Sequence, residues 1–130
     1  MNINGNKVVV NKSQKGTFEF LSDLKNFEQL MPESIQKFEV DGDSFIFGLK
    51  GMPEIRLVLK EKTEYSNITL GAASSKLNFE LVADITKIDD TSSEVQLEFN
   101  GKFNAMMSMM VKRPLTSFIE TLTNNLEGLS

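Results

Sequence analysis

The chain has 130 residues, a formal net charge of −4 and a pI of about 4.9, which is the size of one ordinary domain. Apolar residues make up 40% and charged residues 25%, a balance that supports a hydrophobic core and differs from that of a disordered chain. Neither half carries a dense run of Lys or Arg, so we expect no nucleic-acid partner. We expect residues 1–130 to form a single domain.

The N-terminal residues 1–7 are polar and lack the basic patch and apolar stretch of a secretory signal. No segment approaches the roughly 20 consecutive apolar residues of a membrane-spanning helix. The chain also lacks Cys, which removes disulfides and thiolate metal sites and is consistent with a reducing compartment. We therefore expect a cytoplasmic protein without a transmembrane segment.

The absence of His and Cys also removes most familiar catalytic sites. Ser-His-Asp triads, Cys-His pairs and zinc sites all need residues that this chain does not contain. The glycine spacings of phosphate-binding and dinucleotide-binding loops are missing as well. Only Asp, Glu, Lys, Arg and the single tyrosine, Tyr65, remain for acid-base chemistry. We assign no catalytic residue, no metal and no cofactor.

The first elements in the chain are a strand and two short helices. Val8–Val10 is a β-branched run typical of a strand, and Ser13 is a suitable N-cap for a helix over residues 14–23. Asn26 can cap a second short helix, which Pro32 would end.

From Ile35 onward, apolar and polar residues alternate with a period of two, and Asp41-Gly42 marks a hairpin turn. About six consecutive strands with one apolar face, joined by short turns, indicate an antiparallel meander with one solvated face. Together with the first strand they predict an α+β fold whose sheet has about seven strands.

The apolar face of this sheet needs a cover, and the C-terminal segment provides one. Its apolar residues share one helical stripe: Leu115, Ile119, Leu122, Leu126 and Leu129. A helix over residues 110–127 would be about 27 Å long. Pro114 is expected in the first turn of this helix, with a kink that widens a cavity mouth as the alternative.

This order of elements resembles the START-like helix-grip superfamily, also called the SRPBCC or polyketide cyclase-like superfamily. Residues 27–32, at the exit of the second helix, and residues 103–115, before the last helix, are similar to that pattern. The resemblance implies a curved antiparallel sheet, two short helices after strand 1, and a long C-terminal helix packed across the concave face.

The resemblance also implies a cavity between sheet and helix that holds a small hydrophobic molecule such as a lipid, quinone, polyketide or aromatic compound. We expect binding or carriage of such a ligand rather than catalysis. Gly101 and Ala83 on the same face would leave room for it. The expected lining residues are Phe45, Phe47, Leu57, Phe79, Leu81, Phe99, Phe103, Met106, Met110 and Phe118.

Two alternative functions remain open. A cyclase or dehydratase would need a buried carboxylate with a shifted pKa, for which Glu61 with Tyr65 as its partner is the candidate pair. An interaction module would dock a protein or a membrane through four clustered methionines, Met106, Met107, Met109 and Met110. The same methionines could instead fill gaps in the core or line the cavity.

Overall fold

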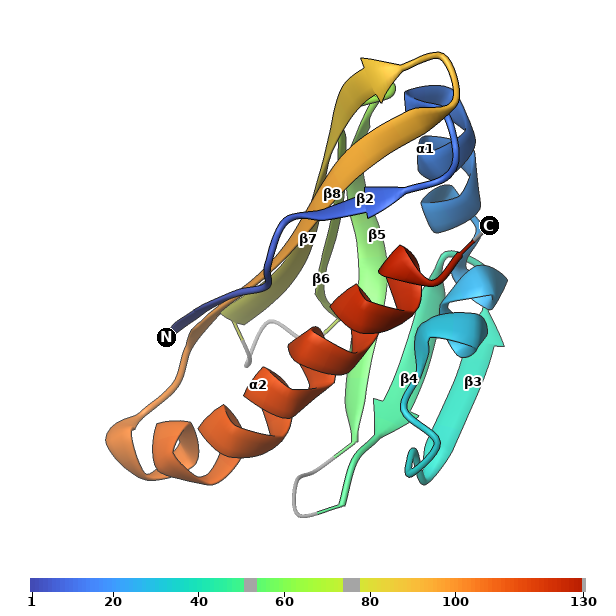
Figure 1. Cartoon of the computed structure of the whole chain (residues 1–130). Coiled ribbons are helices and arrows are strands. Elements are labelled where there is room, and N and C mark those ends of the chain that lie inside the picture. Colours follow the sequence, from blue (N-terminus) through green and yellow to red (C-terminus); the bar gives the residue numbers. More distant parts are fainter. Residues whose placement is uncertain (51–53, 74–77, 130) are drawn as a thin grey trace.

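The computed structural model describes residues 1–50, 54–73 and 78–129 of the chain (Figure 1). Within these residues, eight strands form one sheet, and α1 (Gln14–Ser22), the 3-10 helix η1 (Leu24–Leu30) and α2 (Ala105–Glu127) lie against it. The strands are β1 (Asn2–Asn4), β2 (Val8–Val10), β3 (Lys37–Asp41), β4 (Ser44–Gly48), β5 (Ile55–Thr63), β6 (Asn67–Ala72), β7 (Asn78–Asp89) and β8 (Ser92–Lys102).

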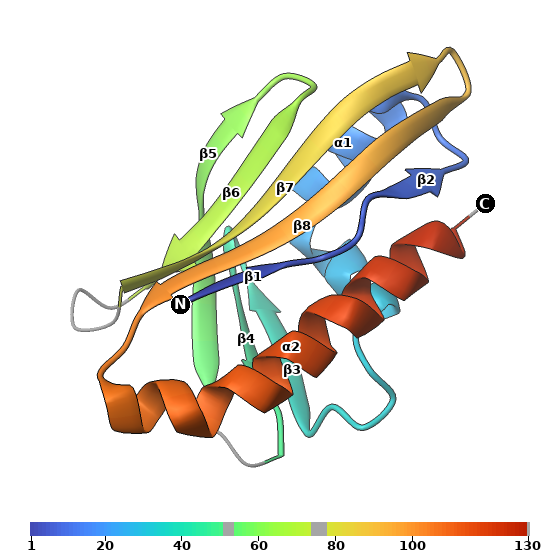
Figure 2. The same ribbon diagram turned by 60° about the vertical axis from the view of Figure 1, so that its left-hand side comes forward.

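The sheet is antiparallel throughout the described strands, with the order β1-β8-β7-β6-β5-β4-β3 and with β2 paired to β8 beside β1. Strands β3 to β8 form the expected meander, and the N-terminal strands β1 and β2 extend the sheet by pairing with β8 (Figure 2). The α+β architecture and the antiparallel sheet are therefore confirmed. The strand that the sequence did not predict is β1, which has only three residues and buries only Ile3.

The two short helices after β2 are present, although the second differs from its prediction. Ser13 caps α1 as expected, because its Oγ accepts the backbone N–H of Gly16 at 3.0 Å. The second helix is a 3-10 helix capped by Asp23, and the Asn26 side chain instead donates to the carbonyl of Phe20 at 2.9 Å. The prediction of Asn26 as the cap was wrong because Asp23 can satisfy the first free N–H groups one turn earlier.

The C-terminal helix α2 begins five residues before its predicted start at residue 110. Asn104 caps it by accepting the backbone N–H of Met107 at 2.8 Å. Its 23 residues make it about 35 Å long. Pro114 consequently lies inside the helix rather than in its first turn. Because proline has no N–H, the carbonyl of Met110 lacks its usual partner within the helix.

Helix α2 crosses the concave face of the sheet, as expected (Figures 1 and 2). The side chains that it buries are Val111, Leu115, Phe118, Ile119, Leu122, Thr123 and Leu126. They pack towards β1, β2, β8 and η1, while Phe118 reaches β4. No described helix combines the length and the apolarity that a membrane span requires.

Candidate functional site

The candidate site is the concave face of the sheet, where residues directly opposite each other in paired strands point to the same side. Phe45 lies opposite Leu57, and Leu81 lies opposite Phe99. These four side chains are all at most 2% exposed. The alternation in the sequence therefore predicted correctly that they face the interior. Their contact with a ligand stays a prediction.

One aromatic group connects this face to α2. The rings of Phe47 and Phe118 stack almost in parallel, with centroids 4.6 Å apart and planes 5° apart. Phe45 lies beside Phe47 with centroids 6.0 Å apart, and Phe27 of η1 stacks on Phe45 at 5.3 Å. Sheet, 3-10 helix and α2 therefore meet in continuous aromatic contact at β4.

A second aromatic group lies near the start of α2. Phe79 stacks with Phe99 and with Phe103, at centroid distances of 5.7 and 6.3 Å. The space above Gly101, which the sequence suggested as room for a ligand, is filled by the Phe103 ring. A Cβ built on Gly101 would lie 2.5 Å from Cε2 of that ring. The expectation of free space at Gly101 was wrong because Phe103 follows β8 and folds back over the glycine.

The expected lining residues Met106 and Met110 lie on the surface. Their exposures are 75% and 53%, and that of Met109 is 82%. The hypothesis that these three methionines fill core gaps is therefore wrong. Only Met107 of the cluster is partly buried and packs against the core. The structure thus separates Met106 and Met110 from the buried phenylalanines of the concave face.

The polar candidates Glu61 and Tyr65 do not form a buried pair. Leu59 lies opposite Leu70, whereas Glu61 lies opposite Thr69, so a β-bulge falls between them. The extra residue changes which face the following side chains occupy, and Glu61 is exposed. The expectation that Glu61 continues the inward row was therefore wrong. Tyr65 is half-buried, and its ring lies at 87° to the ring of Phe18, with the two centroids 5.5 Å apart.

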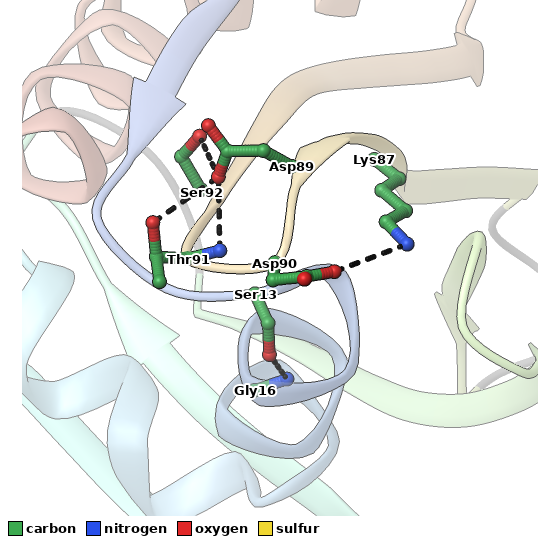
Figure 3. Close-up of polar contacts among 7 residues, drawn as sticks. All are labelled: Ser13, Gly16, Lys87, Asp89, Asp90, Thr91 and Ser92. Atoms are coloured by element: carbon green, nitrogen blue, oxygen red, sulfur yellow. Dashed lines mark hydrogen bonds and ion pairs between the residues drawn. The ribbon is translucent and has the colours of Figure 1, made fainter.

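Tyr65 instead borders a polar corner between the start of α1 and the turn that joins β7 to β8. Figure 3 shows the polar side chains of this corner. The backbone N–H of Thr91 and the hydroxyl of Ser92 both donate to Asp89 at 2.9 Å, which lowers the pKa of that carboxyl. Asp90 pairs with Lys87 at 3.5 Å. These contacts lie within the hairpin turn that joins β7 to β8.

A recess beside Pro114 reaches the aromatic contact between the sheet and α2. It has a volume of about 200 Å³ and is lined by Pro32, Ser34, Leu49, Lys50, Pro114, Ser117, Phe118 and Thr121. Phe118 is the predicted lining residue that it includes. The wall formed by Pro32, Leu49 and Lys50 was missed, because the loop after η1 and the residues that follow β4 carry no pattern that predicts their approach to α2.

The buried polar side chains of the described residues are uncharged. They are Thr17, Ser93 and Thr123. Thr17 and Ser93 share a hydrogen bond of 2.7 Å, whereas Oγ1 of Thr123 has no partner. An acid-base reaction needs an ionisable group within reach of the substrate. The fully buried side chains of the described residues are therefore apolar or carry a hydroxyl group.

The architecture is a helix-grip fold, in which a long C-terminal helix packs on an antiparallel sheet, and solved structures are similar to it over nearly the whole chain. Norcoclaurine synthase from Thalictrum flavum, in complex with dopamine and hydroxybenzaldehyde, matches with a TM-score of 0.71 at 11% identity, over 98% of this chain and 84% of that one. A START superfamily protein from Mycobacterium smegmatis matches with a TM-score of 0.66 at 14% identity, over 98% and 94% of the two chains.

A conserved protein from Geobacillus kaustophilus is also similar, with a TM-score of 0.68 at 13% identity over 98% of this chain and 93% of that one. Comparison with protein-family models and with curated proteins gave no match. At these identities the likeness establishes the fold and leaves the activity to be argued from the residues of this chain.

Proposed function

We propose that this protein binds or carries a small hydrophobic molecule between the concave face of the sheet and α2. The observation that carries the proposal is the recess beside Pro114, which reaches Phe118 where its ring stacks on Phe47. A recess of about 200 Å³ is smaller than the roughly 300–1,000 Å³ of typical ligand pockets. Binding would therefore require Phe118 to move and open the space behind it.

The chemistry of the surrounding side chains favours a flat, conjugated ligand or the ring of a larger lipid. Phe45, Phe47 and Phe118 offer ring faces and edges, which suit offset stacking with another aromatic system. Ser117 and Thr121 on α2 border the same recess and could hydrogen-bond one polar substituent. An aromatic compound, a quinone or a polyketide has this combination of groups.

The alternative of a cyclase or dehydratase finds no support at Glu61, because that carboxylate is exposed on the far side of the bulge. The described buried polar groups are hydroxyls. A binding protein is therefore the function that the described residues support best.

Native mass spectrometry of gently purified protein, followed by solvent extraction, tests occupancy and identifies the chemical class of any ligand. A titration with the fluorescent probe N-phenyl-1-naphthylamine measures binding directly. Ser117→Trp, which places an indole in the recess, should weaken probe binding about tenfold or more, whereas Glu127→Trp at the end of the same helix should not. Equal probe binding by both variants, with no extractable ligand in the native protein, would refute the proposal.

A further inference from the structure

The first two turns of α2 are apolar on both sides of the helix. Met107 and Val111 face the core, while Met106, Met109 and Met110 face outward with exposures of 75%, 82% and 53%. The spacing of these three is i, i+3 and i+4, which places them on one stripe of a helix. We call Met106, Met109 and Met110 the methionine stripe.

The exposed methionines set this stripe apart from an ordinary solvent-facing helix surface. Such a surface is usually polar, and a helix that is apolar all round is normally covered on every side. The remaining large apolar side chains with high exposure among the described residues, Val9 and Ile88, are single and lie on β2 and β7. A second partner, in addition to the sheet, is therefore expected for this end of α2.

The charged residues next to the stripe along the chain are all positive. Lys102, Lys112 and Arg113 are exposed, and the sequence contains no Asp or Glu between Glu98 and Glu120. Arg113 lies seven residues after Met106 and so continues the stripe. The segment is therefore positively charged although the chain has a net charge of −4. None of the three cations forms an ion pair within the described part of the chain.

We propose that the methionine stripe docks on the surface of a bilayer containing anionic phospholipid. Apolar side chains on one helix face, with Lys and Arg beside them, are the arrangement of helices that lie in the membrane interface. The long basic side chains can reach the phosphate groups while the methionines enter the acyl boundary. Unbranched methionines adapt to a fluid surface without requiring a matching shape.

The position of the stripe favours a bilayer over a second protein molecule. The stripe lies at one end of the molecule, on the outward side of the first turns of α2, which are orange in Figures 1 and 2. A protein partner of this acidic chain would have to supply acidic groups opposite Lys112 and Arg113, whereas self-association would bring these like charges together. An anionic bilayer supplies a continuous negative surface that matches them.

This docking does not require the proposed ligand, and lipid vesicles without any added ligand test it. Purified full-length protein is mixed with vesicles of phosphatidylcholine alone, or of phosphatidylcholine and phosphatidylglycerol in equal parts, and bound protein is separated by flotation. We expect binding to the mixed vesicles, little binding to phosphatidylcholine alone, and loss of binding in high salt because exposed charges are screened.

Two sets of variants separate the apolar and the electrostatic contributions. Replacing all three stripe residues by Gln should lower the partition coefficient about tenfold or more, whereas Ile88→Gln, which removes an exposed apolar side chain on β7, should not lower it. The pair Lys112→Glu and Arg113→Glu should lower it about 30-fold or more. The pair Lys25→Glu and Lys62→Glu makes the same change in net charge on other exposed positions and should have a much smaller effect.

Circular dichroism melts show whether each variant is still folded. We expect the stripe variant to be folded, because the side chains that it replaces are exposed. Equal flotation of the stripe variant and the native protein overturns the proposal. So does equal loss in the two charge-reversed pairs, since that result would mean a general charge effect. Dimers in light scattering that the stripe variant converts to monomers, without vesicle binding by the native protein, would assign the stripe to a second copy of this chain instead.

Discussion

The stacked pair of Phe47 and Phe118 allows a quantitative test of how α2 is held on the sheet. The two side chains are 0% and 2% exposed, and their rings are 4.6 Å apart. Phe→Leu keeps most of the apolar volume and removes the ring. Each single replacement should lower the free energy of unfolding by about 1–2 kcal/mol. About 0.5–1.5 kcal/mol of each loss should belong to the ring pair itself.

A double-mutant cycle isolates that pair energy, because the second replacement cannot remove the same contact again. Urea denaturation of the native protein, Phe47→Leu, Phe118→Leu and the double variant gives the four free energies. The coupling should be about 0.5–1.5 kcal/mol. The matched cycle pairs Phe99→Leu with Phe118→Leu and should be additive within about 0.3–0.5 kcal/mol, because Phe99 stacks on Phe79. Equal coupling in the two cycles would refute the assignment of this contact.

Three further predictions test other parts of the fold. Gly5→Ala should lower the free energy of unfolding by about 1–3 kcal/mol, because its Cβ would lie 2.7 Å from Oγ1 of Thr123. Thermal melts should show that adding Thr123→Ala restores part of this stability. If the double variant is no more stable than Gly5→Ala alone, the predicted clash is contradicted. Ser13→Ala should cost about 1 kcal/mol by removing the cap of α1, while Ser34→Ala, at an exposed loop position, serves as its control in the same urea titrations. Asp89→Asn should reduce the acid dependence of stability: its pKa is lowered in the folded protein by Thr91 and Ser92, so this contribution is present above the unfolded pKa and is lost as the pH falls through the folded one. Identical slopes of unfolding free energy against pH for Asp89→Asn and the native protein would count against that account.

Much of the architecture followed from local patterns in the sequence. Alternation with a period of two assigned Phe45, Leu57 and Phe99 to one face, because successive side chains of a strand point to opposite sides. The apolar residues that recur at helical spacing from Leu115 to Leu126 likewise predicted the buried side of α2. Capping by Ser13 was predictable because a side chain three residues away satisfies the free N–H of Gly16.

The sequence also determined what this protein lacks, since a chain without His or Cys cannot form sites that depend on them. The tertiary structure decided how the apolar face is filled. The bulge before Glu61 moved that carboxylate outward, and Phe103 folded back over Gly101. Both depend on contacts between neighbouring strands or across a chain reversal, which a local period does not contain.

The two sides of α2 also show which features the sequence determined and which the tertiary structure decided. The methionines at positions 106, 109 and 110 have the composition of core residues, and their helical spacing alone does not say which side of α2 meets the sheet. Val111, Leu115 and Phe118 occupy that side, so packing left the methionine stripe facing outward. Sequence therefore determined which residues are apolar, whereas the docking of α2 decided which of them are enclosed and which are available to a partner.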